Sequence, residues 1–305
     1  NHNQWENARA NLPDKIRVVE ISSSDAWMRD VGPTFVTNAS GRLRGVHWKF
    51  NAWGGLDGGL YFPWFRDSLV ARKVLEIEGV DRYRAPLVME GGSFHVDGQG
   101  TLITTEECML HRNRNPQMTR EQIENALKSN LDVQKVVRLE KGVYRDETNG
   151  HVDNLCCFVG PAEVLLTWTD DEADPQYAIS RSAFNILSNR TDARGRAFRV
   201  HKIHQPDPMR ITEAECQGLD ASETAKPRRA GDRLAGSYVN FYIANRGIVM
   251  PLFDDPRDRD AIDLLTRLFP DRHVVGIKSR EILLGGGNIH CITQQVPLNG
   301  HGSES

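Results

Sequence analysis

The chain has 305 residues, of which 39% are hydrophobic and 26% are charged, and its net charge is −3. This composition is typical of a globular protein, and it includes no basic region of the kind that nucleic-acid-binding proteins carry. The sequence also lacks an apolar stretch as long as the roughly 18 residues that span a membrane, so neither nucleic acid nor a membrane is expected as a partner.

The predicted elements recur in one order along the chain: a helix, a short strand, a loop, and two strands joined by a tight turn. In the first unit, the helix is expected at residues 2–12, the strand at 16–21 and the two-strand hairpin at 34–48. The second and third units repeat this order. Their helices, strands and hairpins are expected, in turn, at 65–78, 86–89, 94–105, 118–131, 134–139 and 155–168.

Two local signals support these assignments. The sequence DGQG at 97–100 is typical of a hairpin turn. Thr119 and Gln122 have the spacing of a capping box, in which the two residues satisfy the free N–H groups at the start of a helix.

The fourth unit extends from about residue 175 to 253 and ends in a hairpin expected at 238–253. Its connecting stretch, residues 204–232, is long and irregular, which indicates a lid or a surface insertion. The fifth unit begins with a helix expected at 258–269 and a strand at 273–277, and a glycine-rich loop follows.

Five such units, each too small to bury its own apolar face, favour an α/β fold in which the units surround a common axis. We expect one catalytic domain over residues 1–305, a five-bladed pseudo-symmetric α/β propeller whose connecting loops gather at one end. A doubly wound α/β sheet is the competing architecture, but the hairpin in each unit counts against it.

The last unit has one predicted strand, at 288–297, and a polar, glycine-rich sequence after it. A strand without a neighbour would expose unpaired backbone groups. We therefore expect that strands upstream of Asn1 pair beside residues 289–293 and close the ring, so that the domain over 1–305 is short of N-terminal strands.

The loops of the repeated units carry side chains capable of catalysis, namely Asp30, Glu90, His151, Asp153 and Cys291. Each of these alone is more often a turn, cap or packing residue. As a set at corresponding places, they indicate one shared site. Carboxylates gathered in a pocket favour a cationic guest, and a planar guanidinium can donate paired hydrogen bonds to them.

The same set of side chains predicts a reaction. A guanidinium held by carboxylates presents its carbon to a thiolate, and its positive charge lowers the pKa of Cys291 when it arrives. His151 can protonate the departing ammonia and then accept a proton from the attacking water. The guanidine becomes a urea, and neither a metal nor an organic cofactor is needed.

The chain has five cysteines, an odd number that excludes complete pairing into disulfides within one chain. We interpret Cys108, Cys156, Cys157 and Cys216 as small buried or surface residues of a protein in a reducing, cytoplasmic compartment. Cys291 is different because it lies directly behind a run of three glycines.

Six motifs follow one another between Trp5 and Pro297: WMRDVGPTFV, NAWGG, EGGSFHVDGQGT, TNGHVDN, AGSYVNFYIAN and GGGNIHCITQQ. Together they resemble the motif series of the agmatine deiminases (agmatine iminohydrolases), members of the guanidine-modifying pentein superfamily with a five-bladed α/β propeller. The resemblance implies a hydrolase that converts agmatine into N-carbamoylputrescine and ammonia, a step in polyamine (putrescine) biosynthesis or in nitrogen catabolism. It also implies a cytoplasmic enzyme without a cofactor and, by analogy, a homodimer.

By this resemblance, Cys291 is the nucleophile that carries a covalent amidino intermediate, and His151 is the general acid and base. Asp30 and Asp153 are the carboxylates that hold the guanidinium. Glu90 either joins these two carboxylates or orients His151.

The resemblance also assigns the far end of the substrate. Glu147 would receive the amine of agmatine, and Trp27 would lie along its aliphatic chain. A solvated loop charge is the alternative for Glu147, and a core position is the alternative for Trp27. For Trp48 and Trp53 we favour the core.

Other readings of these residues remain open. His95 and His290 could be further bases, although the His290 side chain should point away from that of Cys291 if this segment is extended. A metal site could join His151, Asp153 and the pair at 156–157, but strand alternation sends the two cysteines of that pair to opposite faces.

Among functions, a cysteine protease also combines a cysteine and a histidine, yet no local signature of the papain or caspase type is present. A deiminase of free arginine or of peptidyl-arginine is the nearest alternative. A propeller scaffold without activity is the alternative from another class, and it would release no ammonia from any guanidine.

Overall fold

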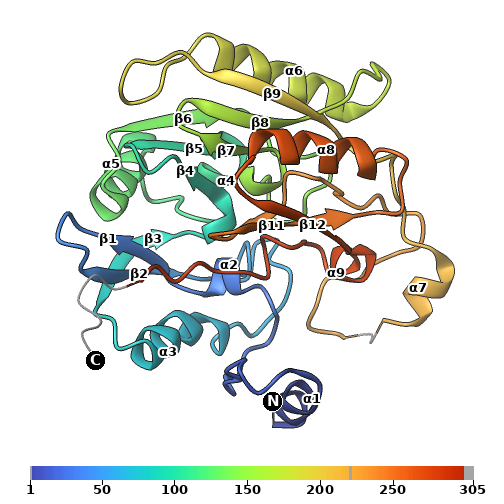
Figure 1. Ribbon diagram of the computed structural model, residues 1–305. Coiled ribbons are helices and arrows are strands. Elements are labelled where there is room, and N and C mark those ends of the chain that lie inside the picture. Colours follow the sequence, from blue (N-terminus) through green and yellow to red (C-terminus); the bar gives the residue numbers. More distant parts are fainter. Residues whose placement is uncertain (1, 220–221, 299–305) are drawn as a thin grey trace.

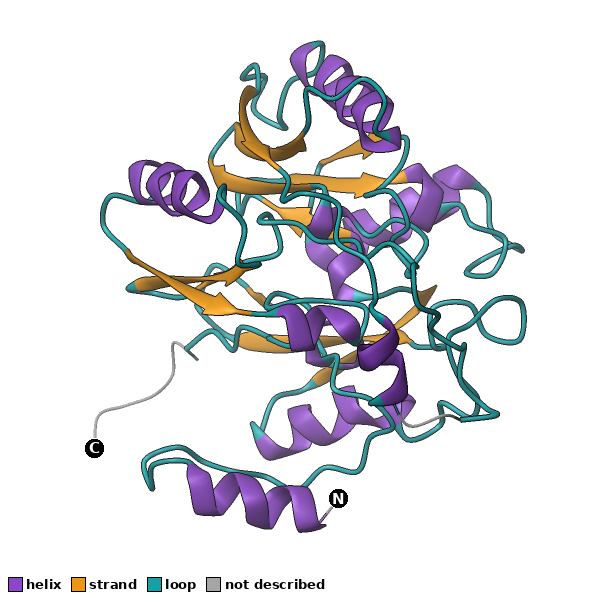
Figure 2. Cartoon of the chain, turned by 90° about the vertical axis from the view of Figure 1, so that its right-hand side faces the viewer, coloured by secondary structure: helices purple, strands orange, loops and turns teal. Residues whose placement is uncertain are grey.

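The computed structural model describes residues 2–219 and 222–298. Within them the strands form four separate three-stranded sheets, which follow one another around the molecule (Figure 1). Helices α3, α5 and α6 lie at the periphery of this arrangement, and the short helix α2 lies towards its middle. Figure 2 shows the strands in separate groups, so the competing doubly wound sheet is wrong.

All four sheets share one topology: an antiparallel hairpin is joined by a third strand that runs parallel to the second strand of the hairpin. A helix connects the second and third strands, as a parallel crossover requires. The strands are β1 (Thr34–Thr37), β2 (Leu43–Lys49), β3 (Arg82–Val88), β4 (Phe94–Val96), β5 (Thr101–Thr105), β6 (Lys135–Leu139), β7 (Cys156–Gly160), β8 (Glu163–Trp168), β9 (Arg199–His204), β10 (Tyr242–Ile243), β11 (Gly247–Leu252) and β12 (His273–Lys278).

The helices follow the signals in the sequence. The capping box of Thr119 and Gln122 is confirmed at the start of α5. Asp174 caps α6, whose first residue is Pro175. The helices are α1 (His2–Asn11), α2 (Met28–Val31), α3 (Val70–Ile77), α4 (Glu106–Met109), α5 (Arg120–Leu131), α6 (Pro175–Ser188), α7 (Glu213–Gln217), α8 (Asp258–Leu268) and α9 (Arg280–Leu284), with 3₁₀ turns η1 (Asp67–Leu69), η2 (Gly91–Ser93) and η3 (Val152–Asn154).

The central strand of each sheet is the most buried. In β8, every residue from Val164 to Trp168 is buried, because this strand has a neighbour on each side and apolar layers on both faces. In β7, Cys156 and Cys157 point to opposite faces and belong to two different apolar clusters. All five cysteines carry free thiols. None of the helices in the described residues has the length and apolar character needed to cross a membrane.

Two predicted strands are wrong. Residues 16–21 and 288–297 contain no strand in the part of them that the structure describes. In the second segment, backbone hydrogen bonds join residues three or four positions apart. The N–H of Ile292 donates to the carbonyl of Asn288 at 3.2 Å, and that of Thr293 donates to the carbonyl of His290 at 3.1 Å. Such bonds form tight turns and leave no extended edge. The described residues therefore form four of the five expected sheets.

Candidate active site

The five residues that the sequence singled out come together, and all five are buried. Each lies in or beside a short turn that follows a repeated unit: Asp30 in α2, Glu90 before η2, His151 before η3, Asp153 within η3, and Cys291 in the turns after the glycine run. The turns that carry Asp30, Glu90 and the residues 151–153 lie directly before the hairpins that begin with β1, β4 and β7, whereas no strand follows the turns of Cys291 in the described residues. This arrangement confirms that corresponding loops meet at one place.

The α-carbon of Gly92 lies where three of these side chains converge. A β-carbon on Gly92 would be 2.6 Å from Nδ1 of His151, 2.9 Å from Oδ2 of Asp153 and 3.0 Å from Oδ1 of Asp30. Contacts this short do not occur for real side chains. Glycine is therefore required here, and an imidazole nitrogen and two carboxylate oxygens face one small volume.

The glycine run in front of Cys291 has a packing role. A β-carbon on Gly287 would lie 2.6 Å from the Trp27 ring and 3.0 Å from the Cys291 sulfur. One on Gly285 would also come within 3.0 Å of that ring. The glycines thus allow the Trp27 ring and the Cys291 sulfur to pack directly against the backbone of the same residue, Gly287.

His290 does not point away from the site, contrary to the expectation from an extended segment. Its Nδ1 lies 2.8 Å from Oδ2 of Asp153, and the thiol of Cys291 is 3.5 Å from the same oxygen. Because the backbone turns at these residues instead of extending, consecutive side chains can face the same group. Burial lowers the pKa of His290 well below its ordinary value, so its neutral ring can donate the Nδ1 proton to Asp153.

Glu90 is held between a cation and the histidine. One of its oxygens accepts a hydrogen bond from Nε of Arg114 at 2.8 Å, and the other lies 3.5 Å from Nε2 of His151. Burial opposes the charge on Glu90, but Arg114 and then His151 outweigh it and lower the pKa of the carboxyl. Glu90 therefore contacts the side of His151 that faces away from Gly92.

Asp30 has fixed hydrogen-bond donors. The N–H of Gly92 donates to its Oδ1 at 2.9 Å, and the indole N–H of Trp53 donates to its Oδ2 at 2.8 Å. Burial nevertheless raises the pKa of Asp30 to about 6. Trp53 is a core residue as expected, and its N–H also contacts the site, whereas Trp48 is buried and donates to Thr34.

His151 and Cys291 differ in charge. Burial disfavours the charged form of His151, but the carboxylate of Asp30 and the nearby side chains of Cys108 and Glu90 outweigh it and raise its pKa well above the ordinary value. Burial, and then the charges of Asp153 and Asp30, raise the pKa of the Cys291 thiol. Before a cation enters, the site thus holds a protonated imidazole and a neutral thiol.

Sequence reasoning missed Asn240, which is fully buried beside Cys291. Its Oδ1 accepts the backbone N–H of His290 at 2.9 Å, so its Nδ2 must face the Cys291 sulfur, 3.2 Å away. Asn240 lies in the motif AGSYVNFYIAN, which was the only available signal. Arg114, which holds Glu90, carried no recognisable signal.

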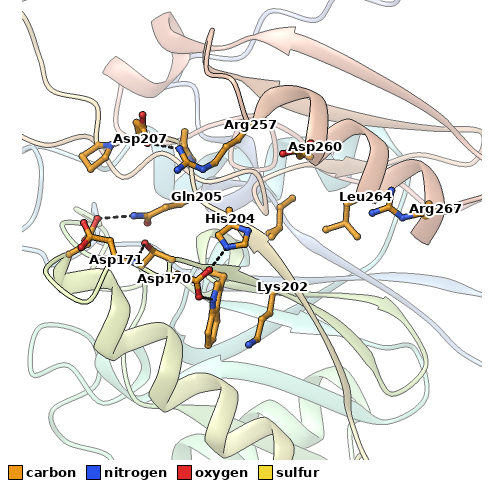
Figure 3. A pocket seen from close by; sticks show the side chains of 17 residues that line it. Asp170, Asp171, Lys202, His204, Gln205, Asp207, Arg257, Asp260, Leu264 and Arg267 are labelled. Carbon is orange, nitrogen blue, oxygen red and sulfur yellow. Dashed lines mark hydrogen bonds and ion pairs between the residues drawn. The ribbon is translucent and has the colours of Figure 1, made fainter.

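Glu147 lies farther out, at the rim of a cavity of about 810 Å³ that Arg228 and Gly286 also line. Its Oε2 is 2.7 Å from Nη2 of Arg228. A second cavity of about 600 Å³ lies elsewhere, between the ends of β8 and β9 and helix α8 (Figure 3). Two charged pairs lie among its lining residues: His204 with Asp170 at 2.8 Å, and Arg257 with Asp207.

The metal site considered from the sequence, which joined His151 and Asp153 to Cys156 and Cys157, is wrong. The two cysteines are buried in separate apolar clusters, so they cannot share one ion. Among the described residues, one other group has ligand atoms close enough to share an ion: Glu90, Cys108 and His151. The guanidinium of Arg114 already supplies a positive charge to Glu90 there. His95 is structural, since its Nδ1 accepts the backbone N–H of Phe158 at 3.2 Å and burial lowers its pKa to about 3.

Comparison with known proteins identifies the family. Residues 1–297 match the Porphyromonas-type peptidyl-arginine deiminase family. The chain belongs to this family. It is 60% identical over 296 residues to an agmatine deiminase of Pseudomonas fluorescens, covering 96% of this chain and 80% of that protein. An agmatine deiminase of Pseudomonas aeruginosa is 58% identical, with the same coverage.

A solved structure of a family member supports the fold. The agmatine deiminase of Enterococcus faecalis superposes with a TM-score of 0.93 at 49% identity, covering 97% of this chain and 81% of that one. The family membership and this superposition confirm the resemblance inferred from the six motifs, and with it the mixed α/β fold of the pentein type.

Proposed function

We propose that this protein is an agmatine deiminase, which hydrolyses agmatine to N-carbamoylputrescine and ammonia through a covalent intermediate on Cys291. The observation that carries the proposal is the convergence at Gly92 of the imidazole of His151 with the carboxylates of Asp30 and Asp153. The similarity to agmatine deiminases at about 60% identity supports the choice of substrate.

The carboxylates suit a guanidinium. In the described residues, Oδ1 of Asp153 is buried and has no hydrogen-bond partner. A buried acceptor in this state is costly unless a donor arrives. A guanidinium between Asp153 and Asp30 would supply N–H donors to both, and its positive charge would compensate the two carboxylates.

Binding of this cation also activates the nucleophile. The neutral thiol of Cys291 loses its proton to water more easily once a positive charge lies beside it, and the thiolate regains a proton from water after the product has left. The thiolate attacks the guanidinium carbon and forms a C–S bond. His151 then gives its Nδ1 proton to one nitrogen, which leaves as ammonia, so that an amidino-thioether remains.

The second half of the reaction reverses the role of His151. Its neutral Nδ1 accepts a proton from water while the water oxygen bonds to the amidino carbon. The C–S bond breaks, the thiolate leaves, and the hydroxyl proton passes to ammonia. The products are a substituted urea and ammonium. Glu90 contacts Nε2 and so orients the ring with Nδ1 towards the substrate.

The far end of the substrate would lie along Trp27, with its ammonium at Glu147. Arginine carries an extra carboxylate, which the acidic site disfavours. A deiminase of free or peptidyl arginine is the second candidate, because the family description names peptidyl-arginine and because Arg228 could receive a carboxylate.

The deciding experiment measures ammonia release from agmatine, free arginine and an arginine-containing peptide under the same conditions. We expect agmatine to have the highest kcat/KM by at least about a hundredfold. Equal or faster turnover of arginine would overturn the assignment of agmatine. No ammonia from any of the three would overturn the deiminase itself.

A further inference from the structure

Arg228 occupies the carboxylate that the proposed function reserves for the substrate. Its Nη2 lies 2.7 Å from Oε2 of Glu147 and donates at 2.7 Å to the carbonyl of Gly285. The ion pair rests over Gly286, where a β-carbon would come within 2.7 Å of both groups. Cys291, the proposed nucleophile, lies five residues farther along the chain than Gly286.

Arg228 comes from the long connection between β9 and β10, at a distance in sequence from the catalytic turns. Both side chains are mostly buried, with exposed fractions of 19% for Arg228 and 24% for Glu147. The pair is therefore less screened by solvent than a surface ion pair. The guanidinium of Arg228 is also the same chemical group that the proposed catalytic site receives from the substrate.

We propose that Arg228 is a specificity-determining residue that acts as an internal competitor: it neutralises Glu147 in the free enzyme and must release this carboxylate before the substrate ammonium can bind there. The inference rests on the proposed function. A second cation at Glu147 would lie next to the Arg228 guanidinium in a mostly buried place and would be repelled by it, so the substrate ammonium gains the full attraction of this carboxylate only after Arg228 has left it.

This competition has two consequences. It reduces the apparent affinity for agmatine in proportion to the fraction of molecules in which Glu147 is paired. It also keeps Glu147 paired in the free enzyme, so that small inorganic cations and simple amines must displace Arg228 to reach this carboxylate. Substrates that bring both a guanidinium and an amine retain enough binding energy to displace Arg228.

The test uses Arg228→Gln in the full chain. We expect KM for agmatine to fall about three- to tenfold and kcat to change less than about twofold, because the substrate no longer displaces a partner from Glu147. The dissociation constant of agmatine, measured by calorimetry in the inactive Cys291→Ser background, should fall by the same factor when Arg228→Gln is added. Butylguanidine, which has no amine, should bind equally to both forms.

The matched control is Arg229→Gln. Arg229 is the neighbouring residue, lines the same cavity and has no side-chain partner among the described residues. The change Arg229→Gln removes one positive charge from the cavity, as Arg228→Gln does. A general electrostatic effect on a cationic substrate would therefore lower KM in both variants alike. A similar decrease in both variants would overturn the proposal.

Glu147→Gln completes the design. In that background, the change Arg228→Gln should no longer alter agmatine binding. Unchanged or weaker agmatine binding in the single variant Arg228→Gln would also overturn the competition. Failure of the proposed function has a different signature, because the wild-type protein would then release no ammonia from agmatine whatever stands at position 228.

Discussion

His290 and Cys291 are consecutive residues that contact the same oxygen of Asp153, the first through Nδ1 at 2.8 Å and the second through its sulfur at 3.5 Å. The carboxylate is therefore fixed on one side by a neutral donor, and its other oxygen remains available. We expect His290→Phe to reduce kcat/KM at least about tenfold, since Asp153 would lose a buried partner. Steady-state kinetics with agmatine tests this, and His204→Phe, at the exposed end of β9, is the control.

Removing the charge of either carboxylate that we propose holds the guanidinium should reduce activity more strongly. Asp30→Asn and Asp153→Asn should each lower kcat/KM at least about a hundredfold, which corresponds to about 3 kcal/mol of transition-state stabilisation. Near-normal kinetics in either variant would show that the guanidinium binds elsewhere.

The covalent step can be observed directly. Cys291→Ser should keep its circular dichroism spectrum and retain less than about a hundredth of the wild-type rate, since a serine hydroxyl does not ionise beside a guanidinium. Mass spectrometry of the wild-type protein quenched during turnover should detect an amidino adduct on Cys291. An adduct on another cysteine would contradict the mechanism.

The pKa of Asp30 sets the acid side of the pH profile. Because it is raised to about 6, Asp30 becomes protonated and neutral as the pH falls through that value, and it then loses its attraction for the guanidinium. We expect kcat/KM to decrease below about pH 6. Trp53→Phe removes an N–H donor from Asp30, so the decrease should begin at higher pH in this variant.

Gly92→Ala should abolish activity with little effect on the circular dichroism spectrum. The added methyl group would occupy the volume between His151, Asp153 and Asp30. Gly160→Ala is the matched control, because a β-carbon there meets only the side chain of Glu163, at 3.8 Å. Activity of Gly92→Ala above about a tenth of the wild-type rate would show that substrate does not enter this volume.

Much of this organisation was predictable from the sequence. The hairpins, the helix caps and the meeting of Asp30, Glu90, His151, Asp153 and Cys291 follow from local signals repeated at similar spacing. The failures have physical causes. The segment at 288–297 was read as a strand from its apolar residues, but its backbone bonds close into turns.

Residues that act through others were harder to recognise. Asn240 and Arg114 are ordinary polar residues in the sequence, and only the fold shows that one faces the sulfur and the other holds Glu90. The partner of Glu147 was equally hidden, because Arg228 lies 81 residues farther along the chain, about the length of one unit. Patterns within a segment do not encode pairings between distant loops.

The order of the units divides the chemistry along the chain. Asp30, Glu90, His151 and Asp153 all precede the turn around Gly195, where a β-carbon would meet nothing within 4 Å, whereas Asn240 and Cys291 follow it. In the proposed mechanism, the first part of the chain holds and protonates the substrate, and the second part attacks it. Because the turn also separates the paired strands β8 and β9, we expect a protein cut there to give two inactive fragments that release ammonia only when they meet, so that catalysis would report the encounter of two partners fused to them.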